Sequence, residues 1–315
     1  MSNVQRALLA GPGRFDAVCL YRDSAQGVAV RQIRGAAARL ISFFQDSTCC
    51  PDNLRVLVAL APTVLEQKVP ASFSAEAITS IGNGRFPIGD AAVFVQISAQ
   101  SDAHRMYALR VVNEVLGPVL TSCREIMGAR LLNGQETFGF PDGTPGLGNY
   151  SRSVANALPA DGAWLLFQRF RQNATEFFRS AKTPLEMALI VGIAPVGTRR
   201  SEAQVQKHVA AQPPMHAHVP LMRAAKATII RRGFPCRHNG EEGLAFVGVT
   251  PAFDTIPHLL RRMNDTPDAL LPFIEAREGG LFYCPPSVDW LEAQDQPAFT
   301  PLTTGPLGTP DTHLL

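Results

Sequence analysis

The first half of the chain alternates between apolar strands and amphipathic helices. Short apolar runs rich in β-branched residues are typical of buried strands, and an apolar stripe with a period near 3.6 predicts a helix. One such helix has its N-terminal cap at Ser101 and is expected to stop at Gly117. The predicted order is strand 15–21, helix 28–44, strand 54–61, strand 92–99, helix 101–117 and strand 119–130.

The second half repeats this order of elements. Thr183 to Gly192 is expected to be helical because Pro184 suits the first turn of a helix. The apolar positions 253, 256, 259, 260 and 263 form one face of a later helix. The predicted order is strand 163–171, helix 183–192, strand 227–234, strand 243–250, helix 253–263 and strand 280–284.

The repeated order of strand, helix, strand, strand, helix, strand is typical of a ferredoxin-like unit. The closest internal match sets residues 89–117 against residues 242–264. We therefore predict an α+β fold with two ferredoxin-like domains, each with an antiparallel sheet and helices on one face. The predicted boundaries are 1–150 for the first domain and 151–296 for the second. Residues 297–315 are rich in Pro, Thr and Gly and are expected to form an extended or flexible tail.

Composition narrows the class of protein. A chain of 315 residues with 46% hydrophobic and 18% charged residues is typical of globular proteins. The net charge of +2 does not favour nucleic acid or an anionic membrane as a partner. The six cysteines contain no C-x-x-C pair, which favours reduced thiols in a cytosolic protein. The first residues lack the apolar core of a signal peptide, and a cytoplasmic location is the expectation.

The segment FGFPDGT, residues 138–144, is the first candidate for chemistry. Pro, Asp and Gly in a row suit a turn, which is the simpler interpretation. Phe138 and Phe140 would place the carboxylate of Asp142 near apolar surface. Desolvation there raises the pKa of a carboxyl group and suits it to carry protons.

The second candidate is the pair His216 and His218, which follows a loop with two prolines. Two surface or core histidines are the simpler interpretation, and zinc binding would need further ligands. The alternative is that one imidazole binds haem iron.

The third candidate is the pair Arg231 and Arg232 in the run IIRRG. On a strand the two side chains face opposite sides, so one of them is expected to be buried or to line a cavity. An arginine in that place needs an anionic partner, and a structural salt bridge or an anionic ligand would both serve.

Taken together and in this order, the segments resemble the dye-decolorizing peroxidase family. The segment GQETFGFPDGT carries the family's G-x-x-D-G motif as Gly139, Asp142 and Gly143. The resemblance continues through GAWLLFQRFRQN, the A-H-V segment at 217–219, IIRRGF, GLAFVGVT and GGLFYCPP. It therefore covers most of the chain.

The resemblance implies a peroxidase that holds haem b, iron protoporphyrin IX, in the second half. His218 would bind the iron, with His216 and His208 as the alternatives. Asp142 and Arg231 would act on hydrogen peroxide on the opposite side of the haem. Phe246, Gly139 and Gly143 would line the haem cavity.

The resemblance also implies partners. They are hydrogen peroxide, an organic electron donor such as a dye or phenol, and further copies of the chain in a homo-oligomer. No nucleic acid or membrane is expected, and docking through the C-terminal tail is a second interpretation of residues 297–315. Two other functions remain open at this stage: a haem-handling protein with little turnover, and a ferredoxin-like binding module without haem.

Four departures from the family pattern mark where the chain differs. His218 and Arg231 are only 13 positions apart, closer than is usual in the family. Ile193 stands where the family often has an arginine near the haem, and Arg199 or Arg200 are the candidates to replace it. Gly233 stands where some members have asparagine. The sequence shows no clear match for the carboxylate that usually orients the iron-binding histidine, and Glu275 is the candidate.

Overall fold

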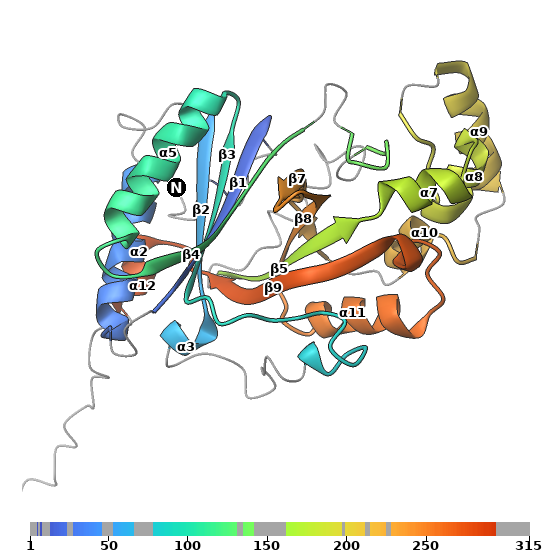
Figure 1. The fold of residues 1–315 in the computed structure, drawn as a ribbon. Coiled ribbons are helices and arrows are strands. Elements are labelled where there is room, and N and C mark those ends of the chain that lie inside the picture. Colours follow the sequence, from blue (N-terminus) through green and yellow to red (C-terminus); the bar gives the residue numbers. More distant parts are fainter. Residues whose placement is uncertain are drawn as a thin grey trace, which may run out of the picture.

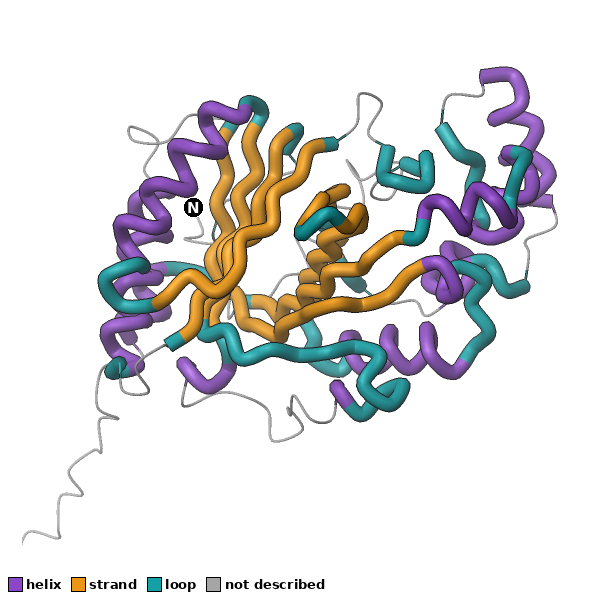
Figure 2. Tube along the Cα trace, in the orientation of Figure 1, coloured by secondary structure: helices purple, strands orange, loops and turns teal. Residues whose placement is uncertain are grey.

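The structure is a computed structural model, and the part of the chain that it describes is a ring of strands with helices outside (Figures 1 and 2). Nine strands form one sheet in this part, in the order β5-β9-β2-β3-β1-β4-β7-β8-β6, and β5 also pairs with β8. The described residues are 5, 7, 13–23, 28–45, 53–65, 78–130, 135–141, 162–196, 199–211, 215–224 and 228–293.

Four antiparallel strands and two covering helices make up the first half. Across the sheet the strands lie in the order β2-β3-β1-β4, which is that of a ferredoxin-like unit. The Ser101 hydroxyl caps the second helix by accepting a hydrogen bond from the backbone N–H of His104, as predicted. The elements are β1 (Phe15–Arg22), α2 (Val30–Gln45), β2 (Leu54–Leu60), α3 (Pro62–Leu65), β3 (Val93–Ala99), α5 (Asp102–Leu116) and β4 (Thr121–Ala129).

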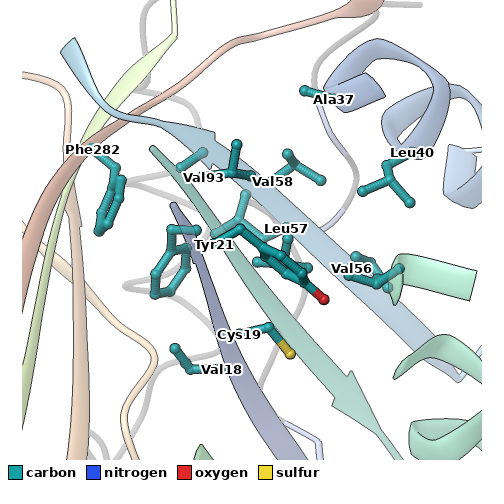
Figure 3. Packing of buried hydrophobic residues seen from close by; sticks show 14 of the residues in the cluster. Val18, Cys19, Tyr21, Ala37, Leu40, Val56, Leu57, Val58, Val93 and Phe282 are labelled. Atoms are coloured by element: carbon teal, nitrogen blue, oxygen red, sulfur yellow. The ribbon is translucent and has the colours of Figure 1, made fainter. Parts of the chain in front are cut away.

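The two faces of this first sheet pack against different partners. Figure 3 shows Ala37 and Leu40 of α2 facing Tyr21, while Phe282 from the second half lies on the opposite side of the strands. The Tyr21 hydroxyl donates a hydrogen bond to Asn113 of α5. Because both faces are covered, β2 and β3 are apolar at most positions, which is the pattern that identified them.

The second half has the same strand order, β9-β5-β8-β7. The two-residue strand β6 pairs with the same edge of β8 as β7 does, with Ile230 opposite Val249 and Arg231 opposite Gly248. The strands are β5 (Ala163–Gln172), β6 (Ile230–Arg231), β7 (Phe234–His238), β8 (Glu241–Thr250) and β9 (Ile274–Cys284). The helices are α7 (Ala174–Ser180), α8 (Pro184–Val191), α9 (Arg199–Ala211), α10 (His218–Ala224), α11 (Thr255–Asp265), η1 (Leu271–Phe273) and α12 (Val288–Ala293).

The two half-sheets join edge to edge and close a ring. One joint pairs Leu60 of β2 with Tyr283 of β9, and the other pairs Gly128 of β4 with Cys236 of β7. Alternate side chains of β5 therefore face the inside of the ring or the outside. Phe167 points inward and contacts Phe94 of the first half. The outward side chains of β5 line the candidate site described below.

Two of the predicted elements differ from the observed ones. The single strand expected over 227–234 is two strands, β6 and β7, separated by Arg232 and Gly233. The strand expected to begin at Gly280 begins at Ile274. The predicted domain boundary at residue 150 and the tail 297–315 lie outside the described residues. Among the helices that are described, none is long and apolar enough to cross a lipid bilayer.

Candidate functional site

A cavity of about 660 Å³ lies against the outer face of the second half-sheet. Side chains of β5, β6 and β8 form one side of it, which we call the strand wall, and α10 and α11 form the other, which we call the helix wall. Most of the lining is apolar, such as Phe246 on the strand wall and Leu260 on the helix wall. A volume of this size with few polar groups is typical of a site for a small molecule or cofactor.

His218 lines the cavity from the helix wall, as the first residue of α10. Its Nδ1 atom lies 2.7 Å from Oδ2 of Asp268, whose side chain is fully buried. A carboxylate at this distance accepts the Nδ1–H of the ring, so that Nε2 keeps a free lone pair. The imidazole thus has the orientation and tautomer of a metal ligand.

Asp268 is held beside His218 by the backbone. Its Oδ1 atom accepts a hydrogen bond from the N–H of Leu270 at 2.9 Å, and the N–H of Ala269 donates to the carbonyl of His216 at 2.8 Å. These bonds join two segments that are far apart in the sequence. The carboxylate that orients His218 is therefore Asp268, and the expectation of Glu275 is wrong. Glu275 lies on an exposed surface, where it pairs with Arg171 and Arg277.

Arg231 and Arg232 face opposite sides, as the strand geometry requires. Arg231 lines the cavity from the strand wall. Arg232 is buried inside the ring, where its Nε atom donates to Oε1 of Gln96 at 3.0 Å and its Nη1 atom donates to the carbonyl of Ala7 at 2.6 Å. Burial lowers the pKa of Arg232 to about 10, although Asp16 nearby favours its charged form. Of these two arginines, it is therefore Arg231 that lines the cavity.

The hairpin of residues 135–141 closes one end of the cavity. Gln135 pairs with Pro141, and Gly139 takes a φ of +86°, a conformation that favours glycine at this position of a short hairpin loop. Phe138 stacks on Phe177 with ring centroids 4.4 Å apart. Phe138, Phe140 and Pro141 all line the cavity. The chain therefore reaches the cavity wall one residue before Asp142.

A buried acid belongs to the same hairpin. Glu136 lines the cavity and is 8% exposed. Its Oε2 atom accepts a hydrogen bond from Nε2 of Gln172 at 2.6 Å, and its Oε1 atom accepts from the backbone N–H of Phe140 at 3.2 Å. Burial raises the pKa of Glu136, and these hydrogen bonds only partly oppose the increase.

The remaining predicted residues divide into three groups. Phe246 lines the cavity. Ile193, at the position where the family often has arginine, and Gly233, where some members have asparagine, line it too. His208 and His216 are exposed and do not line it. Outside the described residues lie Asp142 and Gly143, and the same holds for the side chains of Arg199 and Arg200.

Sequence reasoning missed Asp268, Glu136 and Gln172. The run Thr-Pro-Asp at 266–268 carries a weak turn signal. Nothing in the sequence connects that run to a histidine 50 positions away. In the part of the chain that is described, no group of three or more His, Cys, Asp or Glu side chains is placed to hold a metal ion.

These features define an α+β protein of two ferredoxin-like halves with a cofactor-sized cavity in the second half. One wall of the cavity presents an imidazole braced by a carboxylate, and the other presents a guanidinium. Residues 134–289, about half of the chain, match the family model described as Dyp-type peroxidase, C-terminal. The chain belongs to the Dyp-type peroxidase family, which is a family of enzymes.

Comparison with solved structures supports the fold. The encapsulated DyP-type peroxidase from Mycobacterium smegmatis is 19% identical with a TM-score of 0.72, covering 94% of this chain and 99% of its own. The dye-decolorizing protein from V. cholerae is 20% identical with a TM-score of 0.68, covering 91% and 99%. A variant of DypB from Rhodococcus jostii RHA1 in complex with heme is 18% identical with a TM-score of 0.67, covering 91% and 97%. A search of curated proteins finds no match.

Proposed function

We propose that this chain is a haem-dependent peroxidase that reduces hydrogen peroxide and oxidises an organic donor. The observation that carries the proposal is the cavity with His218 on one wall and Arg231 on the other. A flat apolar macrocycle suits the apolar lining between these two side chains. The DypB variant that shares this fold was solved in complex with heme, which supports the same cofactor here.

In this proposal the bound group is haem b, and it supplies the redox chemistry between peroxide and donor. His218 would hold the iron, because Asp268 accepts the Nδ1–H and leaves the other ring nitrogen for a metal. Phe246 would line the pocket of the macrocycle on the strand wall. Gly139 would shape the turn that borders it, and Gly143 is assigned to the same site by the family motif.

Asp142 and Arg231 act on the peroxide. The Asp142 carboxylate accepts a proton from one peroxide oxygen and returns it to the other, which leaves as water. The fixed charge of Arg231 stabilises the negative charge that develops as the O–O bond breaks. Two electrons from the donor and two protons complete the reduction of peroxide to two water molecules.

The partners of the enzyme follow from the family. The donor is an organic molecule such as a dye or a phenol. We expect a homo-oligomer, and we keep docking through the tail 297–315 as part of the proposal because a protein of this fold was solved as an encapsulated peroxidase.

The test is the absorption spectrum of the haem-loaded full chain before and after one equivalent of peroxide. Arg231→Leu should keep the haem spectrum but slow the reaction with peroxide by about 100-fold or more, the usual cost of removing one group that stabilises developing charge. Asp142→Asn should slow the reaction similarly. Arg237→Leu, an exposed arginine on β7, is the matched control and should change nothing.

Three outcomes contradict the proposal in different ways. A chain that binds haem but leaves peroxide unreacted would be the haem-handling protein. A chain that takes up no haem would be a binding module. Unchanged kinetics in Arg231→Leu would remove Arg231 from the mechanism.

A further inference from the structure

The cavity contains a buried acid that the proposed function does not use. Glu136 lies in its wall, and among the described residues no Arg, Lys or His forms an ion pair with it. Burying a carboxyl group costs free energy unless specific hydrogen bonds offset the loss of water. Glu136 therefore needs an explanation beyond filling space.

The hydrogen bonds of Glu136 join two separate elements. The backbone N–H of Glu136 donates to the carbonyl of Phe140, and the N–H of Gly139 donates to the carbonyl of Glu136, both at 2.9 Å. The N–H of Phe140 donates to the carboxylate of Glu136. The other oxygen of the same carboxylate accepts from Gln172, the last residue of β5. One side chain thus closes the hairpin and ties it to the strand wall.

The other anchors of the hairpin act at its tip. Phe138 stacks on Phe177, and the carbonyl of Gly139 accepts a hydrogen bond from Val196 at 2.9 Å. On the returning strand, Phe140 is held by its edge contact with Phe177, by the backbone bond from the N–H of Glu136, and by the bond from its own N–H to the Glu136 carboxylate. Asp142 follows Phe140 by two positions in the sequence.

We propose that Glu136 and Gln172 form a positioning pair that holds the hairpin 135–141, which leads directly into Asp142, against β5. The pair does not touch the peroxide and acts only through Asp142. This inference rests on the proposed role of Asp142 and adds the residues that set its place.

Substitutions at positions 136 and 172 can be chosen either to keep the link between the hairpin and β5 or to remove it. In Glu136→Gln, the side-chain oxygen at position 136 accepts from the N–H of Phe140. The side-chain nitrogen donates to Oε1 of Gln172 after the Gln172 amide group rotates by about 180°. That oxygen is buried and has no hydrogen-bond partner among the described residues, so it is available. Glu136→Leu and Gln172→Leu, in contrast, remove the link. Thr137→Ala, in the loop of the same hairpin, is the matched control.

The first experiment needs no haem. Hydrogen exchange of the full chain without cofactor, followed by mass spectrometry of peptides covering 135–142, reports on the N–H of Phe140. We expect exchange to rise about tenfold or more in Glu136→Leu and Gln172→Leu, and to stay as in the wild type in Glu136→Gln and Thr137→Ala. Unchanged exchange in both leucine variants would overturn the proposal.

The second experiment asks whether the effect passes through Asp142. In the haem-loaded chain, Glu136→Leu should slow the reaction with peroxide by about 10- to 100-fold, because a displacement of about 1 Å has costs of this size. In the Asp142→Asn background the same substitution should have no further effect. Equal factors in the two backgrounds would contradict the pair's role in positioning. If Glu136→Leu does not fold, Gln172→Leu takes its place in the same comparison of the two backgrounds.

The two proposals fail in distinguishable ways. If Asp142→Asn alone leaves the peroxide reaction unchanged, the proposed role of Asp142 is wrong. If Asp142→Asn slows the reaction but Glu136→Leu and Gln172→Leu do not, only the positioning pair is wrong.

Discussion

At the scale of single residues, the two nitrogens of the His218 ring have different environments. Nδ1 faces the buried carboxylate of Asp268, and the rest of the side chain borders the cavity. A hydrogen bond to an ionised partner is stronger than one between neutral groups, so the carboxylate fixes both the ring orientation and the tautomer. It also makes Nε2 a more basic ligand.

Asp268→Asn tests this bond, because asparagine keeps an oxygen for the N–H of Leu270 but loses the charge. We expect haem affinity to fall by about 10- to 100-fold, the usual effect of losing a partner of a metal-binding histidine. The reduction potential of the haem should become more positive, since the less basic imidazole stabilises the ferric state less. Affinity is measured by haem titration and the potential by spectroscopic redox titration.

Glu275→Gln is the control for this variant. Its side chain is 55% exposed and pairs with surface arginines, so both quantities should stay at wild-type values. Equal affinity in Asp268→Asn and the wild type would show that the carboxylate does not support the ligand.

At the scale of elements, the long amphipathic and apolar segments could be predicted because their periodicity reflects burial. Segments such as α5 and β3 match the prediction to within about two residues. The break between β6 and β7 could not be predicted, because it depends on a neighbouring strand. A Cβ atom on Gly233 would come within 3.0 Å of the carbonyl oxygen of Ala245. The apolar run alone gives no sign of that contact.

The candidate site was predicted only as far as the family resemblance reached. That resemblance supplied His218, Arg231 and Phe246, and all three line one cavity. Asp268 and Gln172 were missed because their partners lie 50 and 36 positions away in the sequence. Periodicity describes single elements, whereas such pairs are set by how the elements pack.

At the scale of the whole molecule, the two ferredoxin-like halves depend on each other through the closed ring. The joint between β4 and β7 rests on one pairing, Gly128 with Cys236. A Cβ atom on Gly128 would come within 2.0 Å of the carbonyl oxygen of Pro235 and within 2.6 Å of the Phe234 ring. Only glycine allows the strands to approach so closely. The sequence predicted each half, but the edge that joins them has no local signature.

Gly128→Ala should therefore destabilise the protein. We expect a loss of about 1–3 kcal/mol in the free energy of unfolding, as for other overpacked sites. The control is Gly35→Ala in α2, where the nearest atom that a Cβ would meet is 3.9 Å away. That substitution should stabilise by about 0.5–1 kcal/mol, since alanine suits a helix better than glycine. Urea unfolding of both variants gives the comparison, and a Gly128→Ala variant as stable as the wild type would mean that the joint is loose.

The most direct measurement of the central claim is a haem titration of the full chain without cofactor, in three forms: wild type, His218→Ala and His216→Ala. His216 is exposed and only two positions from His218, so it serves as a matched control. We expect the wild type and His216→Ala to bind haem with the same affinity and the same Soret band. His218→Ala should lose that band, and added imidazole should restore it. A native Soret band in His218→Ala without imidazole, or its loss in His216→Ala, would contradict the account.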